Sequence, residues 1–453
     1  MRELLRAAAD RAASYLEDLQ GRPVAPNPAA VARLADLDIP MPVAGSSPEN
    51  VLRELDELGS PATMAMAGPR FYGFVIGGSL PAALAANWLA GAWDQNTGLY
   101  NVTPSTAVFE QVALKWMLDL FGLPPNAGGA FVTGTTVAHI SALAAARHAV
   151  LARVGWNVEA DGLFGAPPIT VIVGGEAHPT LSKALGVVGL GRSRVVHVPV
   201  DAQGRMIAEK IPALSGPAII CAQAGNVNTG SFDPLRAICE TARESGAWVH
   251  VDGAFGLWAR VAPTRAYLAD GIELADSWAT DGHKWLNVPY DSGLAFVRDC
   301  EALQSAMSIH AEYLPTVSEH RNPSDFTPEL SRRARGVDVW AALKSLGRAG
   351  VTELVERNCR QARRFAEALS GSGYEILNDV VLNQVLVSFG DPGTTNRVIA
   401  GIQADGTSWC GGTVWQGRTA MRISVISWAT TDEDVERSIG AMLRVAAEVR
   451  GLD

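Results

Sequence analysis

The chain has 453 residues, an ordinary apolar content and a formal net charge of −10. It is long enough to bury a large core and to form two or more domains. The acidic balance, with no block of lysine or arginine, excludes a broad basic surface for nucleic acid or anionic membranes, and we expect partners of neither kind.

Membrane, secretion and disulfide signals are absent from the sequence. The longest apolar stretch, 80–93, is too short for a membrane-spanning helix and contains Asn87. Residues 1–6 are charged and lack the apolar core of a signal peptide. The five cysteines are scattered and odd in number, which is typical of free thiols in a reducing compartment. We therefore expect a cytoplasmic protein without a metal site.

The N-terminal part is predicted to be helical. Residues 1–20 carry apolar side chains at helical spacing, so this amphipathic helix needs a partner surface, on its own subunit or on a second one. Aromatic, glycine-bearing loops at 69–74 and 96–101 are of the kind that often lines sites. Further helices are predicted over 49–58, 81–92 and 105–121.

From about residue 128 to residue 300 short apolar runs alternate with helical segments. This pattern indicates an α/β fold with a mainly parallel, seven-stranded sheet and helices on both faces. The predicted strands are 130–132, 169–173, 195–199, 218–222, 248–251, 277–280 and 293–297.

The C-terminal third begins with a polar, proline-broken segment, for which we expect a mobile loop at about 311–330. A small α+β domain is predicted from helices at 337–350, 351–370 and 432–449 and strands at 380–389 and 419–426. The predicted division is an N-terminal arm and helical segment (1–104), a large domain (105–335) and a C-terminal small domain (336–453).

Lys284 is the most informative residue, because it lies between a histidine and a tryptophan at the end of an apolar run. Lysine side chains are strongly hydrated, and few are buried without a partner or a chemical task. One such task is a Schiff base with pyridoxal 5′-phosphate (PLP), in which a desolvated amine attacks a carbonyl carbon.

Asp252 ends a predicted buried strand at the carboxyl edge of the sheet, where open α/β sheets bind ligands. Taken alone, it could equally cap a turn. PLP enzymes need an acid beside the pyridine nitrogen, because a carboxylate there keeps the ring protonated and able to accept electrons. The pairing with Lys284 therefore favours the cofactor role.

A Gly/Thr turn with Gly134, Thr135 and Thr136 lies between a predicted strand and a helix over 137–146. Backbone N–H groups at a helix start, together with two hydroxyls, can cradle a phosphate, although such junctions are also common without a ligand. No P-loop lysine follows and the dinucleotide glycine fingerprint is missing, which disfavours ATP and NAD.

Other candidate residues also have structural explanations, which for His178 taken alone are the favoured ones. His178 could stack on a flat ring or be a satisfied loop histidine, and His250, inside a strand, is expected to belong to the core. Arg422 could bind a substrate carboxylate or be an ordinary strand arginine. Tyr72 and Tyr100 could line a pocket or act as packing anchors. Neither an acidic nor an aromatic substrate is favoured.

Together these segments resemble the group II PLP-dependent amino acid decarboxylases, a family of fold type I, from about residue 69 to residue 431. The paired segments 250–256 (HVDGAFG) and 281–286 (DGHKWL) are highly specific, and the glycine turn is much less so. Further matching pieces are 69–73, 177–178, 230–235 and 331–335. The resemblance implies a PLP-dependent transferase-like fold, decarboxylation of an L-amino acid to an amine and CO2, and a homodimer with sites at the subunit interface.

The resemblance also implies a role for each matching residue. Lys284 would form the Schiff base, and Asp252 would pair with the ring nitrogen. Ala254 and His178 would pack on opposite faces of the ring, and His178 would also contact the substrate carboxylate. The phosphate would be held by Gly134, Thr135, Thr136, Asp281 and His283.

Two departures from the family pattern leave alternatives open. Asn226 stands where Thr-Thr is usual, and it would lie near the cofactor's O3′. A loop tyrosine that protonates Cα after CO2 leaves is missing from 320–326, and the nearby Tyr313 and His320 are out of register. The alternatives are an oxygen-dependent aldehyde synthase, a Cα–Cβ lyase and, remotely, a non-catalytic PLP-binding protein.

Overall fold

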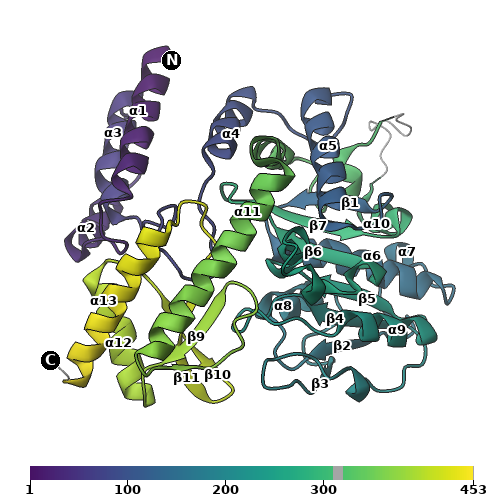
Figure 1. Cartoon of the computed structure of the whole chain (residues 1–453). Helices are drawn as coiled ribbons and strands as arrows, with labels where there is room; N and C mark the ends of the chain where they lie inside the picture. The colour runs from purple at the N-terminus through teal and green to yellow at the C-terminus, as the bar shows by residue number, and fades with distance from the viewer. Residues whose placement is uncertain (310–319, 452–453) are drawn as a thin grey trace. The chain divides into compact units, whose positions relative to one another are not determined.

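The computed structural model describes residues 1–309 and 320–451 and divides into two compact units (Figure 1). The larger unit comprises Ser79–Arg360 and Asn378–Gln384. The smaller unit comprises Met1–Gly78, Gln361–Leu377 and Val385–Asp453. Among the described residues no helix has the length and apolar character needed to cross a bilayer.

A seven-stranded sheet forms the centre of the larger unit, with the strand order β1-β7-β6-β5-β4-β2-β3. The strands are β1 (Gly128–Val132), β2 (Thr170–Gly174), β3 (Val196–Val198), β4 (Ala218–Gln223), β5 (Trp248–Asp252), β6 (Ser277–Asp281) and β7 (Gly293–Val297). Neighbours from β3 to β6 pair in parallel, and β7 runs antiparallel to both β6 and β1. The predicted mainly parallel sheet is confirmed.

The strand directions bring the candidate site together. Because β7 is antiparallel to both of its neighbours, β1 runs in the same direction as β6. The carboxyl ends of β1 to β6 therefore share one edge of the sheet, where ligands bind in open α/β folds. The residues that follow these ends are the ones singled out by the sequence.

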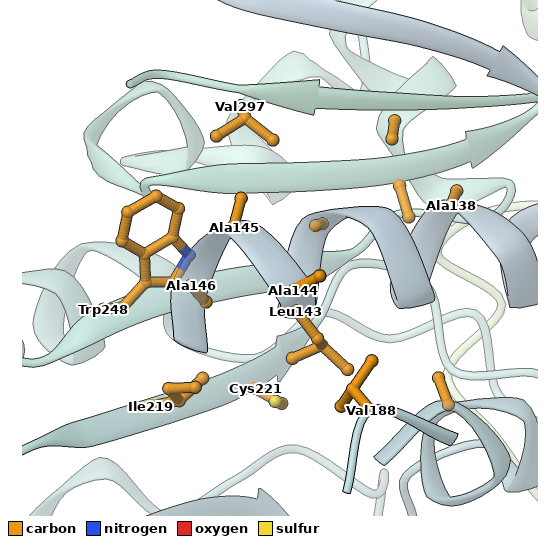
Figure 2. Close-up of a cluster of buried hydrophobic side chains, with 14 of the residues drawn as sticks. Ala138, Leu143, Ala144, Ala145, Ala146, Val188, Ile219, Cys221, Trp248 and Val297 are labelled. Carbon is orange, nitrogen blue, oxygen red and sulfur yellow. The ribbon is translucent and has the colours of Figure 1, made fainter. Parts of the chain in front are cut away.

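Helix α6 (Thr135–Ala152) covers one face of the sheet, as Figure 2 shows. Its sheet-facing side is rich in alanine, including Ala138, Ala142 and Ala145, and these side chains belong to a buried cluster with residues of β4, β5 and β7. Small side chains let the helix backbone lie close to the strands. Every residue of β1, β4, β5, β6 and β7 is buried, as expected when both faces are covered.

The remaining helices of the larger unit precede, connect or follow these strands along the chain. They are α4 (Pro81–Trp93), α5 (Pro104–Phe121), α7 (Val158–Asp161), α8 (Pro179–Val187), α9 (Leu235–Ser245) and α10 (Cys300–Met307). Short helices are η4 (Ala208–Lys210), η5 (Gly256–Val261), η6 (Ala266–Ala269), η7 (Ile272–Leu274) and η8 (Pro323–Phe326).

Helix α11 (Arg335–Gly371) contains the two helices predicted for this segment. The break lies at Gly347, which has φ 59° and ψ 178°, rather than at the predicted residue 350. A positive φ costs glycine little, because it has no Cβ, so the chain interrupts its helical course there.

The smaller unit contains a four-stranded sheet in the order β10-β11-β9-β8. Its strands are β8 (Glu375–Ile376), β9 (Gln384–Ser388), β10 (Gly411–Trp415) and β11 (Arg418–Ser424). Its helices are α1 (Arg2–Asp18), α2 (Pro28–Ala32), η1 (Arg33–Leu37), α3 (Pro48–Glu54), η2 (Leu55–Gly59), η3 (Ser60–Ala62), α12 (Pro392–Asp405) and α13 (Asp432–Arg450).

The sequence prediction for this unit missed β8, β10 and α12. Gln416 and Gly417 form the turn between β10 and β11, and both have positive φ. The glycine at this position was the available sequence signal for a hairpin. A helix-start signal was present too, because the Asp391 side chain accepts hydrogen bonds from the backbone of Gly393 and Thr394 at the start of α12.

Candidate active site

Lys284 follows the carboxyl end of β6 and lies in a turn that is anchored by its apolar neighbours. Trp285 and Leu286 are buried, and the Trp285 indole N–H donates to Asn358 Oδ1 at 3.1 Å. The Lys284 side chain is 19% exposed, and its Nζ lies 2.8 Å from Asp281 Oδ2. The amine is therefore largely desolvated and paired with one carboxylate.

Asp281 joins this lysine to the start of α6. Its Oδ1 accepts a hydrogen bond from the Thr135 backbone N–H at 2.7 Å, and His283 Nε2 lies 3.6 Å away. Burial alone would raise the pKa of Asp281, but the charges of Lys284 and His283 and the hydrogen bonds outweigh it and hold the pKa below its usual range. Asp281 is accordingly an ionised group that positions both Lys284 and the helix start.

The Gly/Thr turn has the form of a ligand cradle. Helix α6 starts at Thr135, two residues earlier than predicted, so its first turn directly follows Gly134. Gly293 allows the close approach of this turn, since a Cβ on Gly293 would lie 2.3 Å from Gly134 Cα. Thr135 Oγ1 is buried and has no hydrogen-bonding partner in the described part of the chain. A buried hydroxyl without a partner is costly, so an acceptor such as a phosphate oxygen fits here.

His283 and Ser292 complete this corner. The Ser292 backbone N–H donates to His283 Nδ1 at 3.2 Å, while Ser292 Oγ is buried and lacks a partner among residues 1–309 and 320–451. Tyr290 stacks on His283 with ring centroids 4.3 Å apart. Burial lowers the pKa of His283 despite the nearby charge of Asp281. The two unpaired hydroxyls, the helix start and the lysine form a donor set that fits a phosphorylated aldehyde such as PLP.

Asp252 lies at the carboxyl end of β5 and is 5% exposed. Its Oδ1 accepts from the Ala254 backbone N–H at 3.1 Å, and its Oδ2 lies 3.5 Å from His139 Nε2. Burial alone would raise the pKa of Asp252, but His139, His178 and Lys284 together hold it well below its usual range. Asp252 is therefore ionised in the buried site.

The segments of Asp252 and Lys284 are tied together by backbone contacts. The Ala254 carbonyl accepts a hydrogen bond from the Asp281 backbone N–H at 3.0 Å and from Thr280 Oγ1 at 3.3 Å. These bonds fix the end of β5 against the end of β6. The two acids and the lysine thus sit on one rigid sheet edge, as a precise site requires.

His178 is the N-cap of α8, where its Nδ1 accepts a hydrogen bond from the Thr180 backbone N–H at 3.3 Å. Thr180 Oγ1 lies 2.7 Å from the same nitrogen. His178 and Asp252 line one narrow pocket, together with Ala177 and Gln223. This pocket lies beside the end of β5, so His178 is near Asp252.

Asn226 is buried, and its side chain is occupied within its own turn. Its Oδ1 accepts from the backbone of Asn228 and Thr229 at 2.9 and 3.2 Å, and its Nδ2 donates to Gln223 Oε1 at 3.1 Å. A contact with a cofactor would have to be added to these bonds. Asn226 thus stabilises its own turn, a role that the family resemblance did not imply.

The four candidate substrate residues fall into two groups. Tyr72 and Arg422 belong to the smaller unit. Tyr72 is buried, with its Oη 3.2 Å from Ser438 Oγ, and Arg422 lies in β11, where burial lowers its pKa. In the larger unit Tyr100 and His320 contact each other, with ring centroids 3.9 Å apart. Tyr313 and the part of the predicted loop before residue 320 lie outside the described residues.

A buried ionic cluster supports the described part of the predicted loop. Glu110 of α5 is fully buried and accepts from Arg332 at 2.7 Å and from Arg321 at 3.0 Å. Nearby, the Tyr100 backbone N–H donates to Asn322 Oδ1 at 3.1 Å. The sequence analysis missed Glu110 and His139, and no local pattern distinguishes either of them from an ordinary helix residue.

Three comparisons with known proteins agree with this geometry. The family described as "Pyridoxal-dependent decarboxylase conserved domain" matches residues 31–390. Tryptophan decarboxylase 1 of Oryza sativa subsp. japonica is 28% identical over 86% of this chain and 80% of its own length. A 4-hydroxyphenylacetaldehyde synthase of Rhodiola rosea is 25% identical over 79% of this chain and 74% of its own. A crystal structure of Oryza sativa TDC with PLP and tryptamine has a TM-score of 0.91, covers 99% of this chain and 97% of its own, and at 24% identity shows the shared fold.

Proposed function

The chain belongs to the pyridoxal-dependent decarboxylase family and is a PLP-dependent amino acid decarboxylase, and we propose that Lys284, Asp252 and His178 carry its chemistry. The observation that supports this assignment is the common edge of the sheet. It holds a desolvated amine, an ionised buried carboxylate and an imidazole, with two unpaired buried hydroxyls close to the amine.

Each of these residues has a task that follows from its contacts. When bound, PLP supplies a ring that accepts the electron pair released from Cα as CO2 leaves. Lys284 would hold the aldehyde carbon through Nζ, and Asp281 positions that nitrogen. Asp252 would keep a proton on the ring nitrogen, because its carboxylate is ionised and buried. Ala254 and His178 would border the two faces of the ring.

The phosphate group is proposed to bind at the start of α6. The turn offers the backbone N–H groups of Gly134 and Thr136 and the hydroxyls of Thr135 and Thr136, at the positive end of the helix dipole. His283 would contribute a ring N–H. Asp281 acts here through its bond to the Thr135 N–H, since a second anion beside the phosphate would repel it.

The reaction outcome depends on which group returns a proton to Cα. The tyrosine expected in the loop is missing, and His320, which contacts Tyr100, is our candidate for the donor. The alternative is oxygen-dependent conversion to an aldehyde. That outcome is favoured by the missing tyrosine and by the similarity to an aldehyde synthase from Rhodiola rosea.

The proposed assembly is a cytoplasmic homodimer. Helix α4 exposes Trp88, Leu89 and Trp93, which are 46%, 57% and 40% exposed. Three large apolar side chains on one helix are typical of an interface. The five unpaired cysteines suit a reducing compartment.

The test is an incubation of the purified protein in air with a panel of L-amino acids. Products are identified by mass spectrometry, and peroxide is measured in parallel. An amine without peroxide supports the decarboxylase with a replacement proton donor. An aldehyde with peroxide selects the aldehyde synthase. A colourless protein that releases no CO2 from any amino acid would contradict both.

A further inference from the structure

A chain of buried polar groups runs from the middle of the sheet to Asp252. The Trp248 indole N–H donates to Ser277 Oγ at 2.9 Å, and Ser277 Oγ lies 2.9 Å from His250 Nδ1. His250 Nε2 lies 2.8 Å from His139 Nδ1. His139 Nε2 then faces Asp252 Oδ2 at 3.5 Å.

The two ends of this chain favour one direction for its hydrogen bonds. An indole N–H can only donate, so Ser277 Oγ accepts there and can pass its own proton to His250 Nδ1. His250 then carries its proton on Nε2 and donates to His139 Nδ1. His139 in turn carries its proton on Nε2, which points at the carboxylate of Asp252. In the reverse direction a lone pair of His139 would face an anion, which is repulsive.

The chain is expensive to bury, which argues that it has a purpose. His139, His250 and Ser277 are all fully buried, and His139 lies in the alanine-rich face of α6. Burial and the neighbouring His139 lower the pKa of His250 to about 3, so its ring is neutral at physiological pH, as the chain requires. His139 Nε2 forms no hydrogen bond with the described residues, and the carboxylate that it faces, at 3.5 Å, is that of Asp252.

The position of His139 on α6 links the chain to the rest of the site. Residues four apart lie on the same face of a helix, so His139 and Thr135 share one face. Thr135 contacts Asp281 at the helix start, and His139 contacts Asp252 one turn later. One helix thus supports both acids of the candidate site. A network serving only the core would not need to end at a carboxylate on the ligand-binding edge.

We propose that His139 is a positioning residue, which receives its orientation from His250 and Ser277 and which holds the Asp252 carboxylate charged and directed at the pyridine nitrogen of bound PLP. The inference rests on the proposed role of Asp252. It adds two histidines and a serine that act through Asp252 and do not touch the cofactor themselves.

The experiment compares three variants of the holoenzyme. His139→Leu removes the N–H donor while retaining bulk, and His139→Gln keeps a donor near the position of Nε2. His148→Leu is the matched control, since His148 is another histidine of α6 and pairs with Glu159 away from the sheet edge. The measurements are the PLP dissociation constant, kcat and KM. In addition, ¹⁵N NMR of histidine-labelled wild-type protein, with and without PLP, reports the tautomers.

We expect His139→Leu to weaken PLP binding and lower kcat by about tenfold to a hundredfold each, the range seen when a metal-binding histidine loses the group that orients it. KM should change little, His139→Gln should recover most of the loss, and His148→Leu should match the wild type. His250 should be neutral and protonated on Nε2, and His139 should carry a proton on Nε2. A His139 that lacks a proton on Nε2, or a His139→Leu protein that binds PLP and turns over like the wild type, overturns the proposal.

The failure of the proposed function would look different. A wild-type protein that neither binds PLP nor releases CO2 would contradict the function itself, and the role at the ring nitrogen would fall with it. A normal wild type with an unaffected His139→Leu variant contradicts this inference alone. If His139→Leu does not fold, the wild-type tautomers and the His139→Gln variant still decide the question.

Discussion

Glu110 offers a sharp test of how the described part of the loop is held. The change Glu110→Gln removes the charge that two arginines share, while the side chain keeps nearly the same shape. Glu110 and Arg332 are fully buried, and Arg321 is 12% exposed. The variant therefore leaves buried guanidinium groups without a counter-charge.

The expected cost follows from this burial. Removing one partner of a buried ion pair destabilises a protein by about 3–5 kcal/mol, because the remaining charge cannot be hydrated. The matched control is Asp119→Asn in the same helix. Asp119 and Arg348 are just as close, at 2.6 Å, but are 75% and 57% exposed, so the expected loss is about 0–1 kcal/mol.

Urea unfolding at neutral pH, followed by circular dichroism, measures both free energies of unfolding. The reasoning requires a clearly larger loss for Glu110→Gln than for Asp119→Asn. Equal losses below about 1 kcal/mol would show that burial does not strengthen this pair, and the account of how residues 320–332 are anchored would fail.

Four further outcomes are expected. Lys284→Ala should abolish the absorbance band of the PLP Schiff base, and retention of that band would refute the lysine assignment. Thr135→Val should weaken PLP binding by about tenfold or more, because a bond to a charged group is lost, whereas Thr135→Ser should not; equal affinities would remove Thr135 from the cradle. His250 has its pKa lowered from 6.5 to about 3, so the unfolded state takes up the proton first as the pH falls. The wild type should therefore lose up to about 1.4 kcal/mol per pH unit below pH 6.5 through this group, and His250→Leu should lack that slope in urea titrations; parallel slopes would contradict the buried neutral ring. Leu89→Asp on α4 should convert a dimer to monomers in light scattering, and an unchanged mass would exclude α4 from the interface.

The sequence by itself determined the fold class and several elements. Buried parallel strands are continuous apolar runs, so β7 was predicted with its observed bounds and the other six strands of the large sheet to within two residues at either end. Asp252 at the end of β5 and Lys284 after β6 could be predicted as site residues from the same local pattern, because residues at the carboxyl end of a buried strand lie at the ligand-binding edge of the sheet. The sequence did not predict β8 and β10, because β8 is short and β10 is half exposed, so neither forms a continuous apolar run.

The tertiary structure alone decided which groups support these residues. Glu110 and Arg332 are 222 residues apart in the sequence, and no local sequence pattern predicts their ion pair. His139 and His250 read as ordinary helix and strand residues until the packing of α6 on the sheet places their rings 2.8 Å apart. The turn that Asn226 forms with its own amide oxygen is likewise visible only in the folded chain. Hydrophobic periodicity is a property of neighbouring residues, whereas the charge and orientation of a buried group depend on the atoms that folding brings around it.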